Sequence, residues 1–295
     1  MTSITSRPPP AVSLSAASTS ASTSSAVLDP PAVRFTKTQD LFDAIYHTRG
    51  DSLTVTSIMY LTNFTKIERA REKQGRKFRF RDYDSNSQIL IITITTDLHE
   101  ELHKRLYDEL IGQIRDMGLK NGWRNIGSAK RLTQQGHSGR SGKEGDSTGG
   151  PDPQRAAKGA WPTLVIEAGF SQSLGSLRLA IQRWFSLSNH EVKVVLLAKF
   201  NGTTILLEKW EEEIQVRPGA TTTRHSFQHL TPVLRQSITI TQNTTTNPIS
   251  YNVTRGALVL SFRLLFLRDP GHGEGDFVFS LQELEEYAKK VWAQV

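Results

Sequence analysis

A carboxylate inside an apolar run is the residue of this sequence whose surroundings most demand a chemical explanation. Glu167 interrupts the stretch Thr163–Ala168 (TLVIEA), which otherwise has the composition of a buried strand. A buried carboxylate must be paired with a cation, protonated, bound to a metal, or placed at the strand end near water. Gly169 and an expected helix follow, which puts Glu167 at the carboxyl end of a parallel strand, where α/β sheets present ligands.

A second carboxylate, Asp146, lies in the preceding glycine-rich run GKEGDS (142–147). Two carboxylates that converge on one point would suit Mg²⁺ or Mn²⁺, because such hard cations prefer oxygen ligands and Mg²⁺ keeps several waters. The bound ion could activate water and stabilise the transition state of phosphodiester hydrolysis. Asp146 and Glu167 are therefore the candidate metal ligands.

Two histidines offer a different metal chemistry. His99, Glu100 and His103 match the string H-E-x-x-H, in which two histidines on one helix face bind zinc. The string begins at the N-terminus of an expected helix, and the third protein ligand cannot be placed from the sequence. Packing of both histidines at the helix start is the simpler interpretation, and a zinc protease is the rival enzyme class.

Positive charge is concentrated between Lys66 and Arg81. The chain has 36 Lys and Arg against 29 Asp and Glu, a formal net charge of +7, and eight of the cations fall in this stretch. Such a cluster raises the local concentration of anions and can contact phosphates, which makes nucleic acid the expected partner. A solvated surface loop is the alternative interpretation.

Composition narrows the function classes and the compartment. The 295 residues include no cysteine, which excludes a disulfide framework, a cysteine-based zinc finger and a cysteine nucleophile. The same absence fits a reducing intracellular compartment, nucleus or cytoplasm. No run of 18 apolar residues is present, so no membrane partner is expected. Residues 1–33 are rich in Ser, Thr and Pro, which predicts a disordered tail without a secretion signal.

The elements around the acids predict an α/β (α+β) fold with a mixed central sheet flanked by helices. Residues 96–118 form the best helical pattern, with Asp97 as the expected N-cap. Other helices are expected at 173–187 and 281–292, and strands at 126–132, near 146, and at 163–168, 192–200, 204–210, 234–241 and 257–267. A strand, a helix and a strand in close succession imply a right-handed parallel crossover. We expect 34–87 to be a partly flexible basic lead-in, and 136–159 to be a glycine-rich loop of an ordered domain at 88–295.

Several ordered blocks of the sequence carry a resemblance to a known family. The blocks are HE (99–100), GKEGDS (142–147), WPTLVIEAG (161–169), SLGSLR (173–178), RWF (183–185), EVKVVLLA (191–198), LEKWE (207–211), TRGAL (254–258) and YAKKVW (287–292). Over roughly residues 85–295 the chain resembles a widespread family of fungal proteins. That family in turn resembles the PD-(D/E)XK nuclease-like superfamily, which has the restriction-endonuclease-like fold.

The resemblance implies a fold order, a site and an activity. The order is a helix, three strands, a helix and a strand, with extra C-terminal strands and a helix in this chain. Asp146 would be the metal-binding aspartate, Glu167 the acid of (D/E)XK, and Glu100 the first-helix glutamate that completes some sites of the superfamily. Asp152 follows a proline and ranks second for the aspartate. The implied activity is that of a metal-dependent phosphodiesterase, a nuclease.

One departure from the motif bears on catalysis. Gly169 holds the position of the motif lysine, which positions or deprotonates water and balances negative charge. Arg178, on the following helix, is the candidate replacement, although its pKa is too high for a general base and it could supply only electrostatic stabilisation. The resemblance therefore leaves two functions open: an active nuclease, or a non-catalytic module of the same fold that binds nucleic acid or protein.

Overall fold

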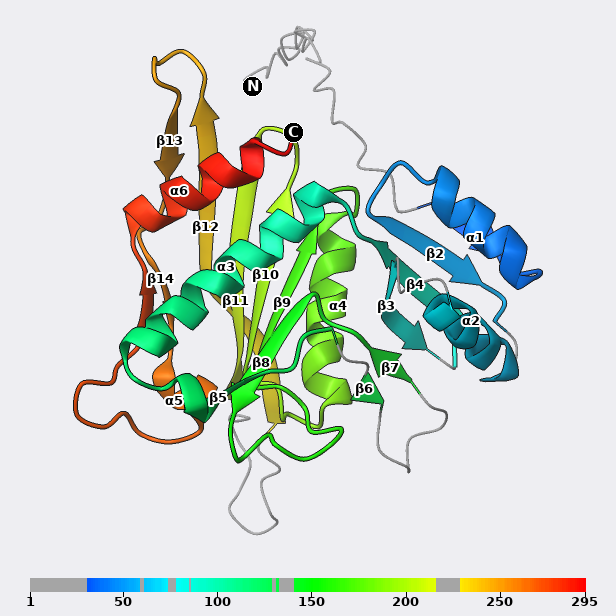
Figure 1. The fold of residues 1–295 in the computed structure, drawn as a ribbon, viewed down its shortest axis with the longest axis horizontal. Helices are drawn as coiled ribbons and strands as arrows, with labels where there is room; N and C mark the ends of the chain where they lie inside the picture. The colour runs from blue at the N-terminus through cyan, green and yellow to red at the C-terminus, as the bar shows by residue number, and fades with distance from the viewer. Residues whose placement is uncertain are drawn as a thin grey trace, which may run out of the picture.

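The computed structural model describes residues 31–58, 61–73, 78–84, 86–128, 131–132, 141–215 and 229–295. Within these residues, helices flank two mixed sheets, which confirms the predicted mixed α/β class (Figure 1). Residues 1–30, most of the expected tail, lie outside the described residues. None of the described helices has the length and apolar character needed to span a bilayer.

Seven strands form the central sheet in the order β13-β12-β11-β10-β9-β8-β5. They are β5 (Trp123–Asn125), β8 (Ser147–Pro151), β9 (Leu164–Gly169), β10 (Val194–Phe200), β11 (Thr204–Gln215), β12 (His229–Asn243) and β13 (Ser250–Val253). Only β9 and β10 are parallel, and helix α4 (Leu174–Leu187) connects them. The predicted parallel crossover is therefore present. Strand β8 pairs with β9 in the antiparallel direction, so the start of β8 lies beside the end of β9.

Alternation along β9 sends its side chains into two cores. Leu164 and Ile166 pack in a cluster with Leu106 of helix α3 (Asp97–Asp116). Val165, between them, packs with Trp184 of α4. Because neighbouring strand residues point to opposite faces, α3 and α4 cover opposite faces of the central sheet. Helix α6 (Leu281–Trp292) lies beside α3 in Figure 1.

A second, smaller sheet has the order β1-β2-β4-β3-β7-β6 and carries two helices. The elements are β1 (Ala32–Arg34), α1 (Thr38–His47), β2 (Ser52–Thr56), α2 (Leu61–Lys73), β3 (Phe78–Asp84), β4 (Ile89–Ile94), β6 (Arg131–Leu132) and β7 (Gly142–Lys143). Phe78 and Phe80 of β3 pack with Leu41 of α1 and Phe64 of α2. This unit has its own apolar core and lies beside the central sheet (Figure 1).

The smaller sheet corrects the expectation that residues 34–87 form a partly flexible basic lead-in. Residues 78–81 alternate, so Phe78 and Phe80 enter the small core while Arg79 and Arg81 point away from it. A register shift between Phe80 and Asp82 then brings Tyr83 into the same core. The number of cations in this stretch does not reveal the alternation, because a strand with one apolar and one basic face can have the same composition as a basic loop.

The glycine-rich run expected as a loop at 136–159 is a loop only in part: residues 136–140 lie outside the described residues, turns follow from Asp152, and strands occupy part of 141–151. Every residue from 141 to 151 is buried, and the run contains β7 and β8. A Cβ atom on Gly149 would lie 2.6 Å from both the Trp123 ring and the Tyr107 hydroxyl. Glycine is present here because two core aromatics approach the strand backbone, and a composition typical of loops therefore marked a tightly packed strand.

Two other sequence expectations differ in detail. Of the strand expected at 126–132, the described residues 126–128 are not a strand, because β5 ends at Asn125. Residues 129–130 lie outside the described residues, and Arg131–Leu132 form β6, which pairs with β7 in the smaller sheet. The strand expected at 257–267 is short: β14 (Leu258–Leu260) pairs with β15 (Phe277–Phe279) and is followed by helix α5 (Phe262–Phe266).

Side-chain caps begin helices α3 and α6. The N-cap of α3 is Thr96, not Asp97, since the Thr96 hydroxyl accepts a hydrogen bond from the His99 amide at 3.2 Å. At the start of α6, Ser280 and Glu283 form a reciprocal capping box, in which the Glu283 amide donates to the Ser280 hydroxyl and the Ser280 amide donates to the Glu283 carboxylate.

Candidate functional site

The two predicted metal ligands lie at the same edge of the central sheet but have different partners. Asp146 immediately precedes β8, and Glu167 lies near the end of the adjacent strand β9. Asp146 contacts His99 of α3, whereas Glu167 accepts a hydrogen bond from the indole of Trp184 in α4. The two carboxylates therefore serve opposite layers of the molecule.

Asp146 is held by three groups. Its Oδ2 accepts from the Ala168 amide at 2.8 Å. Its Oδ1 lies 2.9 Å from Arg79 Nη1 and 3.1 Å from His99 Nε2. The other end of the same guanidinium, Nη2, donates to Glu100 Oε1 at 2.7 Å. Glu100 is thus brought to Asp146 as the resemblance implied, but through Arg79 as the bridging cation.

These contacts set the charges of the two carboxyl groups. Burial alone would raise the pKa of Asp146, but the neighbouring His99, His103 and Arg79 hold it well below its usual range. Burial likewise opposes ionisation of Glu100, yet hydrogen bonds from His103 and Lys104, together with the Arg79 charge, lower its pKa to about 2. Both groups are therefore carboxylates at neutral pH.

Glu167 lies in a second and drier cluster. Its side chain is fully buried, and Arg81 Nε lies 3.4 Å from Oε2. Burial raises the pKa of Glu167, and the charges of Arg81 and Lys143 only partly oppose that rise. Lys143 is also fully buried, which lowers its pKa, and its Nζ lies 3.6 Å from Asp82.

The H-E-x-x-H string forms a compact group whose donor atoms are already engaged. His99, Glu100 and His103 offer atoms within 4.8 Å of one another, the spacing of a metal site. His99 Nδ1, however, lies 3.3 Å from Asp51. Burial lowers the pKa of His99, but the charges and hydrogen bonds of Asp146 and Asp51 outweigh burial and raise this pKa to about 9. A protonated imidazole is not a metal ligand.

Arg79 takes part in this histidine group as well. Its Nη1 lies 3.3 Å from His103 Nε2, while Nη2 donates to Glu100. The other ring nitrogen of His103 lies 2.8 Å from the Ser147 hydroxyl. The guanidinium thus competes for the atoms that a zinc ion would need.

Arg178, the predicted replacement for the motif lysine, does not reach either acid. Its guanidinium forms an ion pair with Glu208 of β11, with Nε donating to Oε2 at 3.1 Å. Glu208 also accepts from the Trp210 indole at 2.9 Å. A buried carboxylate two strands away from Glu167 thus holds the cation.

The cations that do reach the acids come from β3 and β7, which sequence reasoning missed. They are Arg79, Arg81 and Lys143. The alternation of FRFRDYD indicates that two of them share one strand face. No sequence feature indicates which part of the chain that face would meet.

The basic stretch at 66–81 is not one phosphate-binding loop. Arg71 is buried, donates two hydrogen bonds to Glu144 at 2.7 and 3.0 Å, and lies over the Phe80 ring. Arg79 and Arg81 also point inward. Arg76 and Lys77 lie outside the described residues. The cations of α2 that face solvent are Lys66, Arg69 and Lys73.

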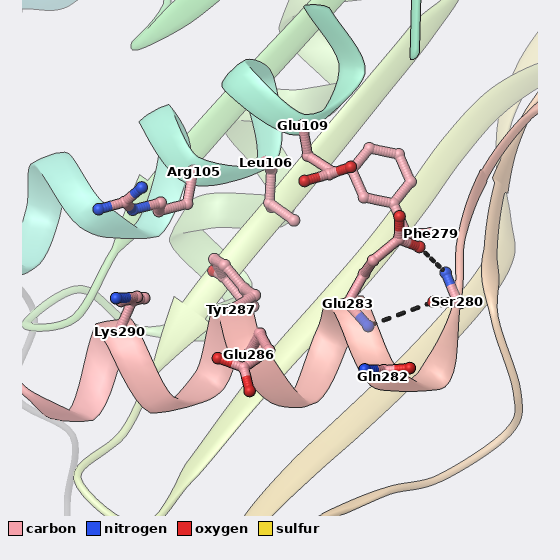
Figure 2. A pocket seen from close by; sticks show the side chains of 10 residues that line it. All are labelled: Arg105, Leu106, Glu109, Phe279, Ser280, Gln282, Glu283, Glu286, Tyr287 and Lys290. Atoms are coloured by element: carbon pink, nitrogen blue, oxygen red, sulfur yellow. Dashed lines mark hydrogen bonds between the residues drawn. The ribbon is translucent and has the colours of Figure 1, made fainter. Parts of the chain in front are cut away.

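Two cavities are lined in part by residues of α3, and the smaller of them reaches the site. One of about 210 Å³ is lined by Arg71, Phe78, Arg79, Thr95, Glu100, Ser128 and Glu144, so it opens onto the Arg79 bridge. A larger cleft of about 520 Å³ lies between α3 and α6, and Figure 2 shows its lining. Neither Asp146 nor Glu167 lines that cleft, so it is separate from the predicted chemistry.

No model of a protein family matches the chain, and no curated protein sequence matches it.

Proposed function

We propose that this chain is a non-catalytic relative of metal-dependent nucleases, on a restriction-endonuclease-like fold, that binds nucleic acid without cleaving it. The order α3, β5, β8, β9, α4, β10 supports the fold assignment, because it is the order that the resemblance implies. Asp146 and Glu167 also lie at one sheet edge, where ligands of α/β sheets bind.

The observation that carries the proposal is the position of Arg79. Its guanidinium bridges Asp146 and Glu100 at 2.9 and 2.7 Å, so it pairs with one of the two expected metal ligands and with the helix glutamate expected to complete the site. A planar, permanently charged group with several donors pairs with both carboxylates without supplying a Lewis acid or an activated water. The acid site then serves as a salt-bridged contact between the two sheets.

The donor atoms do not fit Mg²⁺ or Mn²⁺ in this arrangement. Both oxygens of Asp146 are engaged, and Oε1 of Glu167 accepts from Trp184. The remaining oxygen, Oε2 of Glu167, lies beside Arg81. A divalent ion would have to displace Arg79 before it could coordinate Asp146, so no hydrolytic step through one follows from this geometry.

We propose nucleic acid as the partner because α2 carries an exposed row of cations. Lys66, Arg69 and Lys73 have the spacing i, i+3, i+7, which places them on one helix face, and all three side chains face solvent. A row of cations along one face can contact successive phosphates of a nucleic-acid backbone. Such contacts release counterions from the nucleic acid, so the affinity should fall steeply as the salt concentration rises.

The test is to incubate the purified full chain with labelled single- and double-stranded DNA and RNA in EDTA, Mg²⁺ and Mn²⁺. We expect no cleavage in any buffer and salt-sensitive retention of the strands. The variant Lys66→Glu/Lys73→Glu should lose retention, whereas Lys289→Glu/Arg263→Glu, with the same charge change at exposed positions on α6 and α5, should keep it. Retention that both double variants keep or lose equally would contradict binding through this row of cations.

An active metal-dependent nuclease is the second candidate, and Lys143 favours it. This lysine lies near Glu167, with a pKa lowered by burial, and so offers the amine that Gly169 does not supply. Hydrolysis would require β3 and β7 to move, because neither Glu167 nor Lys143 has exposed surface. Metal-dependent cleavage lost in both Glu167→Ala and Lys143→Met would establish this candidate and overturn the first.

A further inference from the structure

The cleft of about 520 Å³ between α3 and α6 has an apolar base (Figure 2). Leu106, Phe279 and Tyr287 line it, and all three belong to the apolar cluster between these helices and the central sheet. Cavities of this size hold small organic molecules in many proteins, and such sites combine an apolar lining with a few polar groups. The base of the cleft therefore offers apolar contact to a ligand.

Charge divides the cleft into two ends. Glu109 of α3 and Glu283 of α6 lie at one end, and Arg105 of α3 and Lys290 of α6 lie at the other, because the two helices run in opposite directions here (Figure 2). Each helix thus presents to its neighbour a charge of the same sign. Opposite charges in these places would attract each other across the cleft, whereas like charges repel.

The acidic end consists of two carboxyl groups without a neighbouring cation. Neither Glu109 nor Glu283 forms an ion pair with any residue that the structure describes. Burial and the adjacent charge of Glu283 raise the pKa of Glu109. Glu283 accepts a hydrogen bond from the Ser280 amide at 2.6 Å, and hydrogen bonding to Ser280 lowers its pKa. A cation placed between the two carboxyl groups would relieve their repulsion.

The basic end sets a limit on the charge of a ligand. Arg105 forms an ion pair with Glu101 of its own helix at 2.8 Å, so this end is not a site for an anion. Lys290 lies opposite, and a second positive charge on a ligand would meet both side chains (Figure 2). A ligand with one cationic group, followed by an uncharged apolar part, matches the whole cleft.

We propose that the cleft binds a small organic monocation, an amine that carries an aromatic or aliphatic group. Its ammonium lies between Glu109 and Glu283, and its apolar part lies over Phe279 and Tyr287. A metal ion fits less well, because among the described residues the acids of the cleft do not gather at the spacing of a metal site. The proposal is independent of nucleic-acid binding, since α2 does not line the cleft.

The test is calorimetric titration of the full chain near neutral pH and at low ionic strength. The titrants are 2-phenylethylamine, its uncharged analogue 2-phenylethanol, and putrescine, which has two ammonium groups and no ring. The variant Glu109→Gln removes one charge of the acidic end and keeps the shape of the side chain. The control Glu285→Gln makes the same change at an exposed position of α6 outside the cleft.

We expect saturable binding of 2-phenylethylamine to the wild type and to Glu285→Gln. Glu109→Gln should bind it about tenfold or more weakly, the factor expected for a lost charge-assisted hydrogen bond. The wild type should bind the alcohol and putrescine more weakly than the amine. The melting temperature of Glu109→Gln should equal or exceed that of the wild type, because the variant removes a repulsion, and this result would show that the loss of binding is local.

Three results would overturn the proposal. The first is the absence of saturable binding of 2-phenylethylamine. The second is equal affinity of this amine for Glu109→Gln and Glu285→Gln, which would place it outside the acidic end. The third is equal affinity of the wild type for the amine and for either comparison compound, which would show that the charge or the apolar base is not used.

Discussion

At the scale of single residues, the charges of the acid site are balanced by side chains rather than by an ion. Arg79 joins Asp146 to Glu100, and His99 joins Asp146 to Asp51. Removing one partner of a buried ion pair costs more than the pair contributes, because the remaining charge stays buried. These contacts are therefore open to direct test.

The variant Arg79→Met should lower the free energy of unfolding by about 3 kcal/mol, since it leaves Asp146 and Glu100 buried without their bridging cation. Urea unfolding at pH 7 measures the change. Lys104→Met is the matched control, because Lys104 pairs with the same Glu100 but is 58% exposed, and it should cost less than about 1 kcal/mol.

The same variant separates the two candidate functions. With Arg79 removed, Asp146 and Glu100 could accept Mg²⁺, which would raise the melting temperature of Arg79→Met and leave that of the wild type unchanged. Equal small losses for Arg79→Met and Lys104→Met would show that the bridge is not the contact described above.

His99 should make the stability of the protein depend on pH in the alkaline range. Its pKa is about 9 in the folded chain, above the ordinary 6.5, in a pocket bounded by Asp51, Asp146, His103 and Arg79. The native state therefore keeps a proton that the unfolded state loses. The resulting stabilisation is fully present below pH 6.5 and is lost as the pH rises through about 9.

The measurement is the free energy of unfolding between pH 6 and pH 10 for the wild type and for His99→Gln. The wild type should lose stability across this range, by about 1.4 kcal/mol for each unit of pKa difference. His99→Gln should be less stable at pH 6 and show a flatter profile. Parallel profiles for the two proteins would contradict a charged His99.

At the scale of elements, two segments owe their roles to patterns that composition hides. The strand β3 presents Phe78 and Phe80 to one core and Arg79 to the acids, because side chains alternate along a strand. The strand β8 contains glycine because Trp123 and Tyr107 lie against its backbone. Both segments have a composition typical of loops, but both are strands that make structural contacts.

Gly149→Ala should destabilise the protein by about 1–3 kcal/mol, the usual cost of overpacking, because the new methyl would lie 2.6 Å from Trp123 and Tyr107. Thermal melting measures the loss. Gly175→Ala is the control on α4, where nothing lies within 4 Å of the added Cβ atom, and it should be neutral or stabilising by up to about 1 kcal/mol. A neutral Gly149→Ala would contradict the close contact.

At the scale of the whole molecule, the unit built on the smaller sheet lies against the acid edge of the central sheet. Three arginines of the smaller unit reach acids outside its core, namely Arg71 to Glu144, Arg79 to Asp146 and Arg81 to Glu167, and Arg183 of α4 reaches back to Asp82 of β3. The chain thus uses much of its basic stretch to cover acids of its own. Among the described cations of that stretch, Lys66, Arg69 and Lys73 of α2 face solvent.

The sequence by itself determined the local elements. The apolar run around Glu167, the helical period of α3 and the capping box of α6 depend on neighbours within a few residues, and each indicates its element directly. The parallel crossover through α4 followed from a strand, a helix and a strand in close succession. The full burial of Glu167 was only one of the outcomes that the sequence allowed, because a carboxylate near a strand end can also meet water.

Only the tertiary structure decided what the acids bind. Arg79 and Asp146 are 67 residues apart in the chain, and Arg71 and Glu144 are 73 apart. The local sequence around an acid does not identify its distant partner, because the same pattern fits a carboxylate that binds a metal ion and one that pairs with an arginine. The packing of the smaller sheet against the central one placed the arginines there, and it directed Arg178 to Glu208 instead.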